Sequence, residues 1–160
     1  MDIAERDRLI DQLAQMPLQL RTLAQALPPQ RAHWRAQADG FSLVEHACHL
    51  RDLEHEGYQL RIRRLLDENV PALQEIDGSA WALERDYQAQ PLGEALAAFD
   101  AQRSATMRLL VAALPQHAAR KGLFGGFGIV TLAGLAREIA AHDAAHRVEI
   151  AALVEAARAG

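Results

Sequence analysis

Residues 42–69 read SLVEHACHLRDLEHEGYQLRIRRLLDEN and carry a strong helix signal. Ser42 and Glu45 form a capping-box pattern, in which each side chain can satisfy a free backbone N–H group of the first helical turn. Leucines recur at helical spacing after this start, at Leu43, Leu50, Leu53 and Leu60. Pro71 disfavours helical backbone before it, so the pattern predicts one amphipathic helix that ends near Asn69.

Three further helices are predicted around this one. The first spans about 2–27, is stopped by Pro28 and Pro29, and contains Pro17, which we expect to bend or split it. Another begins at Pro91, a residue favoured in a first helical turn, and ends at about Leu114, before Pro115. The last is capped by Thr131 and runs to about Ala157.

The connections between these helices differ in character. Residues 71–90 form a long link, with a short helix expected over 79–87, that could cross the bundle or cover one end of it. The stretch GLFGGFGIVTL, residues 122–132, predicts a flexible glycine-rich loop, and nothing in the chain reads as a strand. The sequence therefore predicts an all-α protein: one four-helix-bundle domain over 1–160, with a long connection between helices 2 and 3.

Composition limits the function. The chain has 160 residues, of which half are hydrophobic, and a net charge of −4, which argues against nucleic acid or an anionic membrane as the main partner. No apolar run approaches the roughly 18 residues of a membrane span, and the charged N-terminus lacks a signal-peptide core, so we expect a cytoplasmic protein. The single cysteine, Cys48, excludes an internal disulfide and a CxxC metal or redox motif.

Two histidines in the segment AHDAAHRVEI, residues 141–150, are candidate metal ligands. His142 and His146 lie about 40° apart on a helical wheel and share their face with Leu135, Ile139 and Leu153. Side chains that point into a bundle core can assemble a metal site, although such a pair can also be merely buried polar residues. A metal site usually needs at least a third protein ligand.

The second predicted helix offers candidates for that ligand. His55 points away from the apolar face, whereas His46 and His49 both remain possible, and periodicity favours His46. Glu56 and Glu149 lie near inward faces and could bind a metal or accept a hydrogen bond from a ligand's second ring nitrogen. His33 and His117 fall in or near loops, where we expect them to be exposed.

Three segments together resemble the DinB superfamily, which includes YfiT-like proteins and thiol-dependent transferases. They are SLVEHACHLRDLE (42–54), Glu84-Arg85-Asp86 and TLAGLAREIAAHDAAHR (131–147), within a resemblance that extends from about Arg6 to Leu153. The resemblance implies a four-helix bundle with a three-histidine metal site. The matching positions here are His49, His142 and His146, so the resemblance favours His49 where periodicity favours His46.

The resemblance also implies a function. Some members are similar to S-transferases that use bacillithiol or mycothiol, so we expect a metal-dependent transferase acting on low-molecular-weight thiols, with zinc, nickel or iron as cofactor, and a homodimer. Arg61, Arg103 and Arg147 are candidate anchors for an anionic thiol, although each could be a surface charge. The alternatives are a metal-dependent hydrolase, a non-catalytic metal-binding or dimerisation module, and a helical interaction protein that binds no metal.

The aromatic residues of the long connection and the single cysteine each have a structural and a functional interpretation. Trp81 and Tyr87 could cover the site, but anchoring the long connection to the bundle is the favoured interpretation. Cys48 and His49 are adjacent, and adjacent helical side chains diverge by about 100°, which argues against a cysteine nucleophile with a histidine base. The sequence contains no phosphate-binding loop and no GxGxxG motif.

Overall fold

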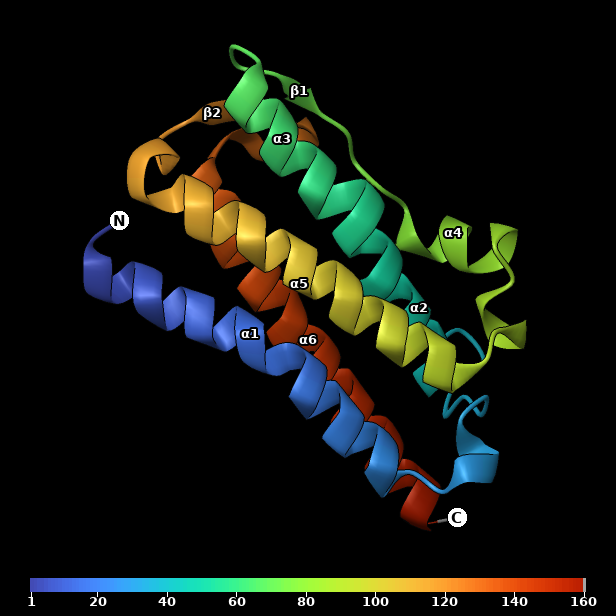
Figure 1. The fold of residues 1–160 in the computed structure, drawn as a ribbon. Helices are drawn as coiled ribbons and strands as arrows, with labels where there is room; N and C mark the ends of the chain where they lie inside the picture. The colour runs from blue at the N-terminus through green and yellow to red at the C-terminus, as the bar shows by residue number, and fades with distance from the viewer. Residues whose placement is uncertain (160) are drawn as a thin grey trace.

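Four long helical segments run side by side along the molecule (Figure 1). The structure, a computed structural model, describes residues 1–159. The first segment is α1 (Ile3–Ala26), and the second is a continuous run of α2 (Leu43–Asp52), a π-helical turn η2 (Leu53–Tyr58) and α3 (Gln59–Asp67). The third is α5 (Leu92–His117) and the fourth is α6 (Leu132–Ala159). The prediction of a four-helix bundle is confirmed.

The long connection after α3 sets the topology of the bundle. It carries the chain back along the outside of α2, through α4 (Gly78–Glu84) and a 3-10 turn η3 (Tyr87–Ala89), to the start of α5. As a result, α2–α3 and α5 run in the same direction, opposite to α1 and α6 (Figure 1). Leu13, Leu65, Leu110 and Ile139 belong to one apolar cluster, and Leu20, Leu43, Phe99 and Ile150 belong to another.

A small sheet closes one end of the bundle, and our prediction of a strandless chain with a flexible loop at 122–132 was wrong. Strands β1 (Ala72–Leu73) and β2 (Lys121–Phe124) pair in parallel, and β2 pairs antiparallel with β3 (Gly128–Thr131). A 3-10 turn η4 (Gly125–Phe127) joins the hairpin, with φ angles of +39° at Gly125 and +75° at Gly128. The glycines therefore build a tight turn rather than a flexible loop, because they adopt left-handed backbone without a Cβ clash.

Capping at two helix starts agrees with the sequence. The Ser42 hydroxyl accepts a hydrogen bond from the Glu45 N–H, and the Glu45 carboxylate accepts one from the Ser42 N–H at 2.8 Å. Thr131 caps α6, since its hydroxyl accepts from the Gly134 N–H at 3.0 Å. Both capping predictions are confirmed, and they fix where the two histidine-bearing helices begin.

Two prolines lie inside helices that continue past them. Pro115 lies inside α5, which continues to His117, so the predicted end at Leu114 was wrong. A proline removes one hydrogen bond to the carbonyl four residues earlier, here that of Val111, whose side chain is exposed on the outer face of the helix. Pro17 lies within α1, which is one continuous helix from Ile3 to Ala26.

The π-helical turn changes which side chains of the second segment face the core. Glu54 and Tyr58 are buried there, while His55 and Glu56 are exposed. Leu60, which the regular helical period placed inward, is 44% exposed. A π-helical turn inserts extra backbone into a helix and so rotates everything beyond it. This explains why a uniform helical wheel misplaces Glu56 and Leu60, which it put near the inward face.

Candidate metal centre

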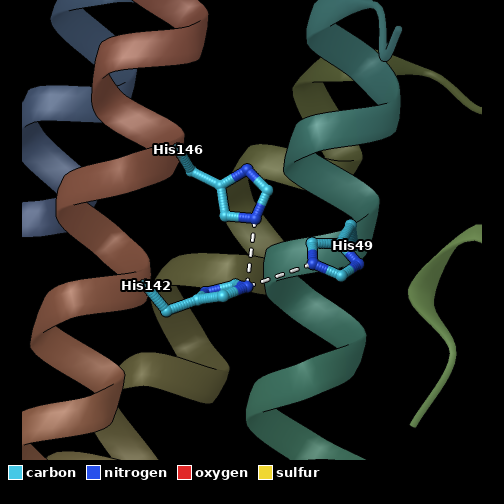
Figure 2. Close-up of side chains that lie close together, drawn as sticks. All are labelled: His49, His142 and His146. Carbon is cyan, nitrogen blue, oxygen red and sulfur yellow. Dashed lines mark hydrogen bonds between the residues drawn. The ribbon is translucent and has the colours of Figure 1, made fainter. Parts of the chain in front are cut away.

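Three imidazole rings from two helices meet inside the bundle (Figure 2). His49 lies on α2, and His142 and His146 lie one turn apart on α6. Residues four apart on a helix project from the same face, so both α6 rings point toward α2, where they meet edge to face at a centroid distance of 4.3 Å. The structure thus brings together the three histidines that the family resemblance indicated.

The Nε2 atoms of these rings converge. The Nε2 atom of His142 lies 3.0 Å from that of His146 and 3.3 Å from that of His49. Zn–N bonds of about 2.0–2.1 Å in a tetrahedral site place ligand atoms about 3.4 Å apart. The spacing of the three nitrogens therefore fits a single transition-metal ion.

The rings are electrically neutral at physiological pH. Burial lowers the pKa of His49 to about 4 and that of His142 to about 3, with the neighbouring histidines adding to the shift. Burial also lowers the pKa of His146, against the nearby Glu149 and Asp143 carboxylates that raise it. Neutral imidazole is the form that binds a metal, so the cluster does not have to lose protons first.

Without a cation, the cluster leaves polar atoms unsatisfied. Three Nε2 atoms face one another, and they cannot all be paired, because a donated proton joins only two nitrogens at a time. Buried polar atoms are nearly always paired, so these residues fit a divalent metal better than a metal-free core.

The second nitrogen of His146 has partners. Its Nδ1 atom lies 3.1 Å from a Glu149 carboxylate oxygen and 3.0 Å from His46 Nδ1. A metal-binding histidine usually donates its other N–H group to such an acceptor, which fixes the tautomer and the ring orientation. Glu149 is therefore placed for the outer hydrogen-bonding role that the sequence left open.

His46 also lies in the core, next to the cluster. Its Nδ1 atom, His146 Nδ1 and a Glu149 oxygen form a second group with a spacing that could hold a metal. Burial lowers the pKa of His46 to about 3, with His146 and His49 adding to the effect. Periodicity favoured His46 and the family resemblance favoured His49, and both rings lie at the site. Of these two, the His49 ring contributes its Nε2 atom to the cluster, whereas the His46 ring contacts Nδ1 of His146.

A cavity of about 750 Å³ opens beside the histidines. Its wall is formed by the 36–41 loop, by α2, by the first turn of α4 and by one face of α6. His46, His49 and His146 line it, and the Phe41 ring packs edge-on against His46 and His49 at centroid distances of 5.5 and 5.6 Å. The cavity has the size of a small-molecule site and reaches the metal-binding cluster.

Gly78 allows the long connection to approach the cluster. A Cβ atom at this position would lie 2.3 Å from Cε1 and 2.6 Å from Nδ1 of His49. The first turn of α4 therefore packs directly on the His49 ring. Sequence reasoning missed this contact, because a glycine at the start of a short helix carries no signal of what lies above it.

The three arginines proposed as substrate anchors lie outside the cavity wall. Arg103 is 1% exposed and binds Glu54 and Asp143 in the core. Arg61 is also buried, where it donates to the Gln74 carbonyl and lies over the Phe124 ring at 4.4 Å. Arg147 is exposed and donates to Gln19 on α1. The structure does not bring these side chains to the candidate site.

The other residues considered as ligands or nucleophiles lie outside the three-histidine cluster. Glu56 binds Arg85 at 2.6 Å, away from the cluster, and His33, His55 and His117 are exposed. Burial raises the pKa of the Cys48 thiol to about 11.

The long connection is anchored to α2, as the favoured interpretation of its two aromatic residues predicted. Tyr87 donates to the buried Asp52 carboxylate at 2.7 Å. Trp81 packs against two apolar clusters of the bundle, and the Arg85 guanidinium, 3.9 Å from the Trp81 ring centroid, donates to Asp52 at 2.8 Å.

The fold and the site define a four-helix-bundle protein with a buried three-histidine cluster suited to a divalent metal. A family model described as the DinB superfamily matches residues 12–150, and the chain belongs to this superfamily. No curated protein matches the sequence. Within the described residues, no helix is long and apolar enough to cross a membrane.

Among solved structures, the chain is similar to YfiT from Bacillus subtilis. That protein is described as a probable metal-dependent hydrolase with an unusual four-helix bundle topology. The match has a TM-score of 0.86 and 21% sequence identity, and covers 96% of this chain and 87% of the other. At this identity the likeness establishes the shared fold.

Proposed function

We propose that this protein is a metal-dependent hydrolase whose metal is held by the Nε2 atoms of His49, His142 and His146. The observation that carries the proposal is the convergence of these three atoms beside an open cavity of about 750 Å³. Three protein ligands leave a coordination position open, which is typical of catalytic rather than structural sites. The description of YfiT supports the same class of reaction.

A divalent metal in such a site lowers the pKa of water and polarises a carbonyl group, which is the chemistry that hydrolysis needs. The chain's own residues do the rest. Glu149 holds the His146 ring through Nδ1, and the first turn of α4 backs the His49 ring. Phe41 packs against the rings of His46 and His49 and forms part of the cavity wall beside them.

Thiol transfer, the function predicted from the family resemblance, is the second candidate. The cavity is large enough for a low-molecular-weight thiol, and a metal with an open position can hold a thiolate. The absence of any arginine or lysine from the cavity lining, within the described residues, counts against an anionic thiol. We therefore place hydrolysis first.

The experiment is to load the full chain with zinc and to assay it in two ways. A panel of small esters and amides is tested without thiol, and cysteine with monobromobimane is tested for thiol transfer. We expect turnover of an ester or amide that is lost with a chelator and in His142→Ala, and retained in His55→Ala, which removes an exposed histidine. Turnover only with thiol would favour the second candidate. Full metal occupancy without turnover in either assay would indicate a non-catalytic metal-binding module.

The proposal keeps two further sequence-based predictions, a cytoplasmic location and a homodimer. The oligomeric state is measured by light scattering during size-exclusion chromatography, where a mass of twice 17.6 kDa is the expected result. Fractionation of the producing cells tests the location.

A further inference from the structure

The cavity beside the histidine cluster is lined by acidic groups and by no arginine or lysine, within the part of the chain that the structure describes. Asp39 contributes one carboxylate from the 36–41 loop, and Glu149 contributes another from α6. Arg35 is the nearest arginine in the sequence to that loop, and it is paired with the buried Glu45. Arg147 follows His146 but donates to Gln19 on α1. No arginine or lysine among the described lining residues therefore offsets the negative charge of Asp39 and Glu149 on the cavity wall.

The two ends of the cavity have opposite electrical character once the cluster holds a metal. Imidazole binds a metal as a neutral ligand, so a divalent ion held by the three Nε2 atoms would keep its positive charge at the inner end. The carboxylates of Asp39 and Glu149 provide negative charge on the wall. Charge complementarity across a site governs which ligands enter and how they are oriented. A matching ligand is electron-rich at one end and cationic at the other.

The distance between these two ends is short. A Glu149 oxygen lies 3.1 Å from His146 Nδ1, and the Nε2 atom of the same ring belongs to the metal-binding cluster. One imidazole ring thus separates the nearer carboxylate from the metal position. Glu149 is also 57% exposed, so a ligand can reach its carboxylate. A cationic group on the substrate would have to lie only a few bonds from the reacting carbonyl.

We infer that the substrate is a small amide or ester with a primary ammonium group a few bonds from the carbonyl that is cleaved. This inference rests on the proposed function. The carbonyl faces the metal, the ammonium group lies against Glu149 and Asp39, and the hydrocarbon part packs on Ala152, Leu153 and Ala156 of α6. Hydrolysis adds water across the carbonyl carbon to leaving-group bond, giving a carboxylic acid and a protonated leaving group.

Three hydroxamates test the inference, because the hydroxamate group binds metals in hydrolases while the other end of the small molecule can be varied. They are β-alanine hydroxamate, butyrohydroxamic acid and succinic monohydroxamic acid, which end in an ammonium, a methyl and a carboxylate group. Their dissociation constants for the zinc-loaded chain are measured by calorimetry. We expect the ammonium compound to bind tightest, roughly threefold to tenfold tighter than the carboxylate compound, as partly exposed charge pairs allow.

Two variants and one control locate the effect. Asp39→Asn and Glu149→Gln should each narrow the difference between ammonium and carboxylate compounds, since they remove charge but keep a hydrogen-bond acceptor. Glu155→Gln removes an exposed carboxylate from the same helix outside the cavity and should leave the difference unchanged. Zinc content is measured in each protein, so that a lost metal is not mistaken for lost selectivity.

The outcomes separate the two proposals. Equal binding of the three compounds, a preference for the carboxylate, or a preference that survives both substitutions would overturn the inference and leave the hydrolase proposal standing. If zinc binds but none of the hydroxamates does, the metal has no open position. The proposed function then fails, and the substrate inference fails with it.

Discussion

Arg103 and Asp143 form a bidentate ion pair in the core, and Asp143 directly follows His142 in α6. The two guanidinium NH₂ groups donate to the two carboxylate oxygens at 2.5 and 2.8 Å, while Nε donates to Glu54 at 2.7 Å. Arg103 also donates to the Leu13 carbonyl at 3.0 Å. One side chain of α5 thereby joins α1, the π-helical turn and α6. Because its partner Asp143 is adjacent to His142, this ion network lies beside the turn of α6 that carries a candidate metal ligand.

The ion network around Arg103 should contribute strongly to the stability of the fold. Arg103→Met should lower the free energy of unfolding by about 3–5 kcal/mol, because it leaves the Glu54 and Asp143 carboxylates buried without their counter-ion. Arg108→Met, at an exposed position of the same helix, should change it by less than about 0.5 kcal/mol. Urea unfolding of both variants provides the comparison. Similar values for the two would show that the network does not stabilise the fold.

Much of this architecture could be predicted from the sequence, because local signals and the global fold agree. The Ser42–Glu45 capping box and the Thr131 cap fix two helix starts from the chain alone. The pair His142 and His146 was placed inward by helical spacing, and both rings lie in the core. These features depend on residues within one or two turns of each other.

The features that escaped prediction depend on contacts between distant segments. Strand β1 pairs with β2 about fifty residues later, and its two residues carry no strand signal of their own. Arg103 was expected at a substrate site, whereas Glu54 and Asp143 neutralise it in the core. The choice between His46 and His49 needed the orientation of α2 against α6, since both face the interior.

Metal binding should distinguish His49 from His46. After zinc loading and dialysis, elemental analysis should find about one zinc per chain in the unaltered protein and a strong loss in His49→Ala and His142→Ala, because each change removes one of three Nε2 ligands. His46→Ala should retain zinc with an affinity weakened about 10- to 100-fold, as expected for an outer partner of His146. His55→Ala serves as the exposed control. Full zinc in His49→Ala with loss in His46→Ala would instead assign the metal to the group of His46, His146 and Glu149.

The metal-free protein should lose stability on mild acidification. The pKa of His142 in the folded chain is about 3, below the usual value of 6.5 that it regains on unfolding. The unfolded chain therefore binds more protons below pH 6.5, and stability present above that pH is lost as the pH falls toward 3. Each such histidine contributes up to about 1.4 kcal/mol per pH unit in this window.

The measurement is the urea midpoint of chelator-treated protein at pH 7.5, 6.5 and 5.5. His142→Asn should make the midpoint less sensitive to pH, while His33→Asn, at an exposed position, should not. A midpoint that stays constant from pH 7.5 to 5.5 would contradict the neutral, buried state of the cluster.

Cys48 should be inert in the folded protein. Burial raises the pKa of its thiol to about 11, and the Sγ atom lies 3.4 Å from Gln90 Oε1. At pH 8 the reactive thiolate is therefore scarce, and reagents cannot reach it. Iodoacetamide should label the native chain at least tenfold more slowly than the chain in urea, by mass spectrometry. Fast native labelling would revive the cysteine nucleophile that the helical spacing argued against.

Gly78→Ala should weaken metal binding without unfolding the protein. The added Cβ atom would lie 2.3 Å from Cε1 of His49, so the ring must move out of the cluster to relieve the clash. Because the ring is the end of a side chain rather than backbone, the change should affect the ligand more than the fold. Zinc affinity, measured by competition with a chromophoric chelator, should fall about tenfold or more while the urea midpoint changes little. Gly93→Ala is the matched control, since a Cβ there meets nothing within 4 Å and alanine favours the helix. Equal zinc affinity in both variants would mean that the first turn of α4 does not hold His49 in place.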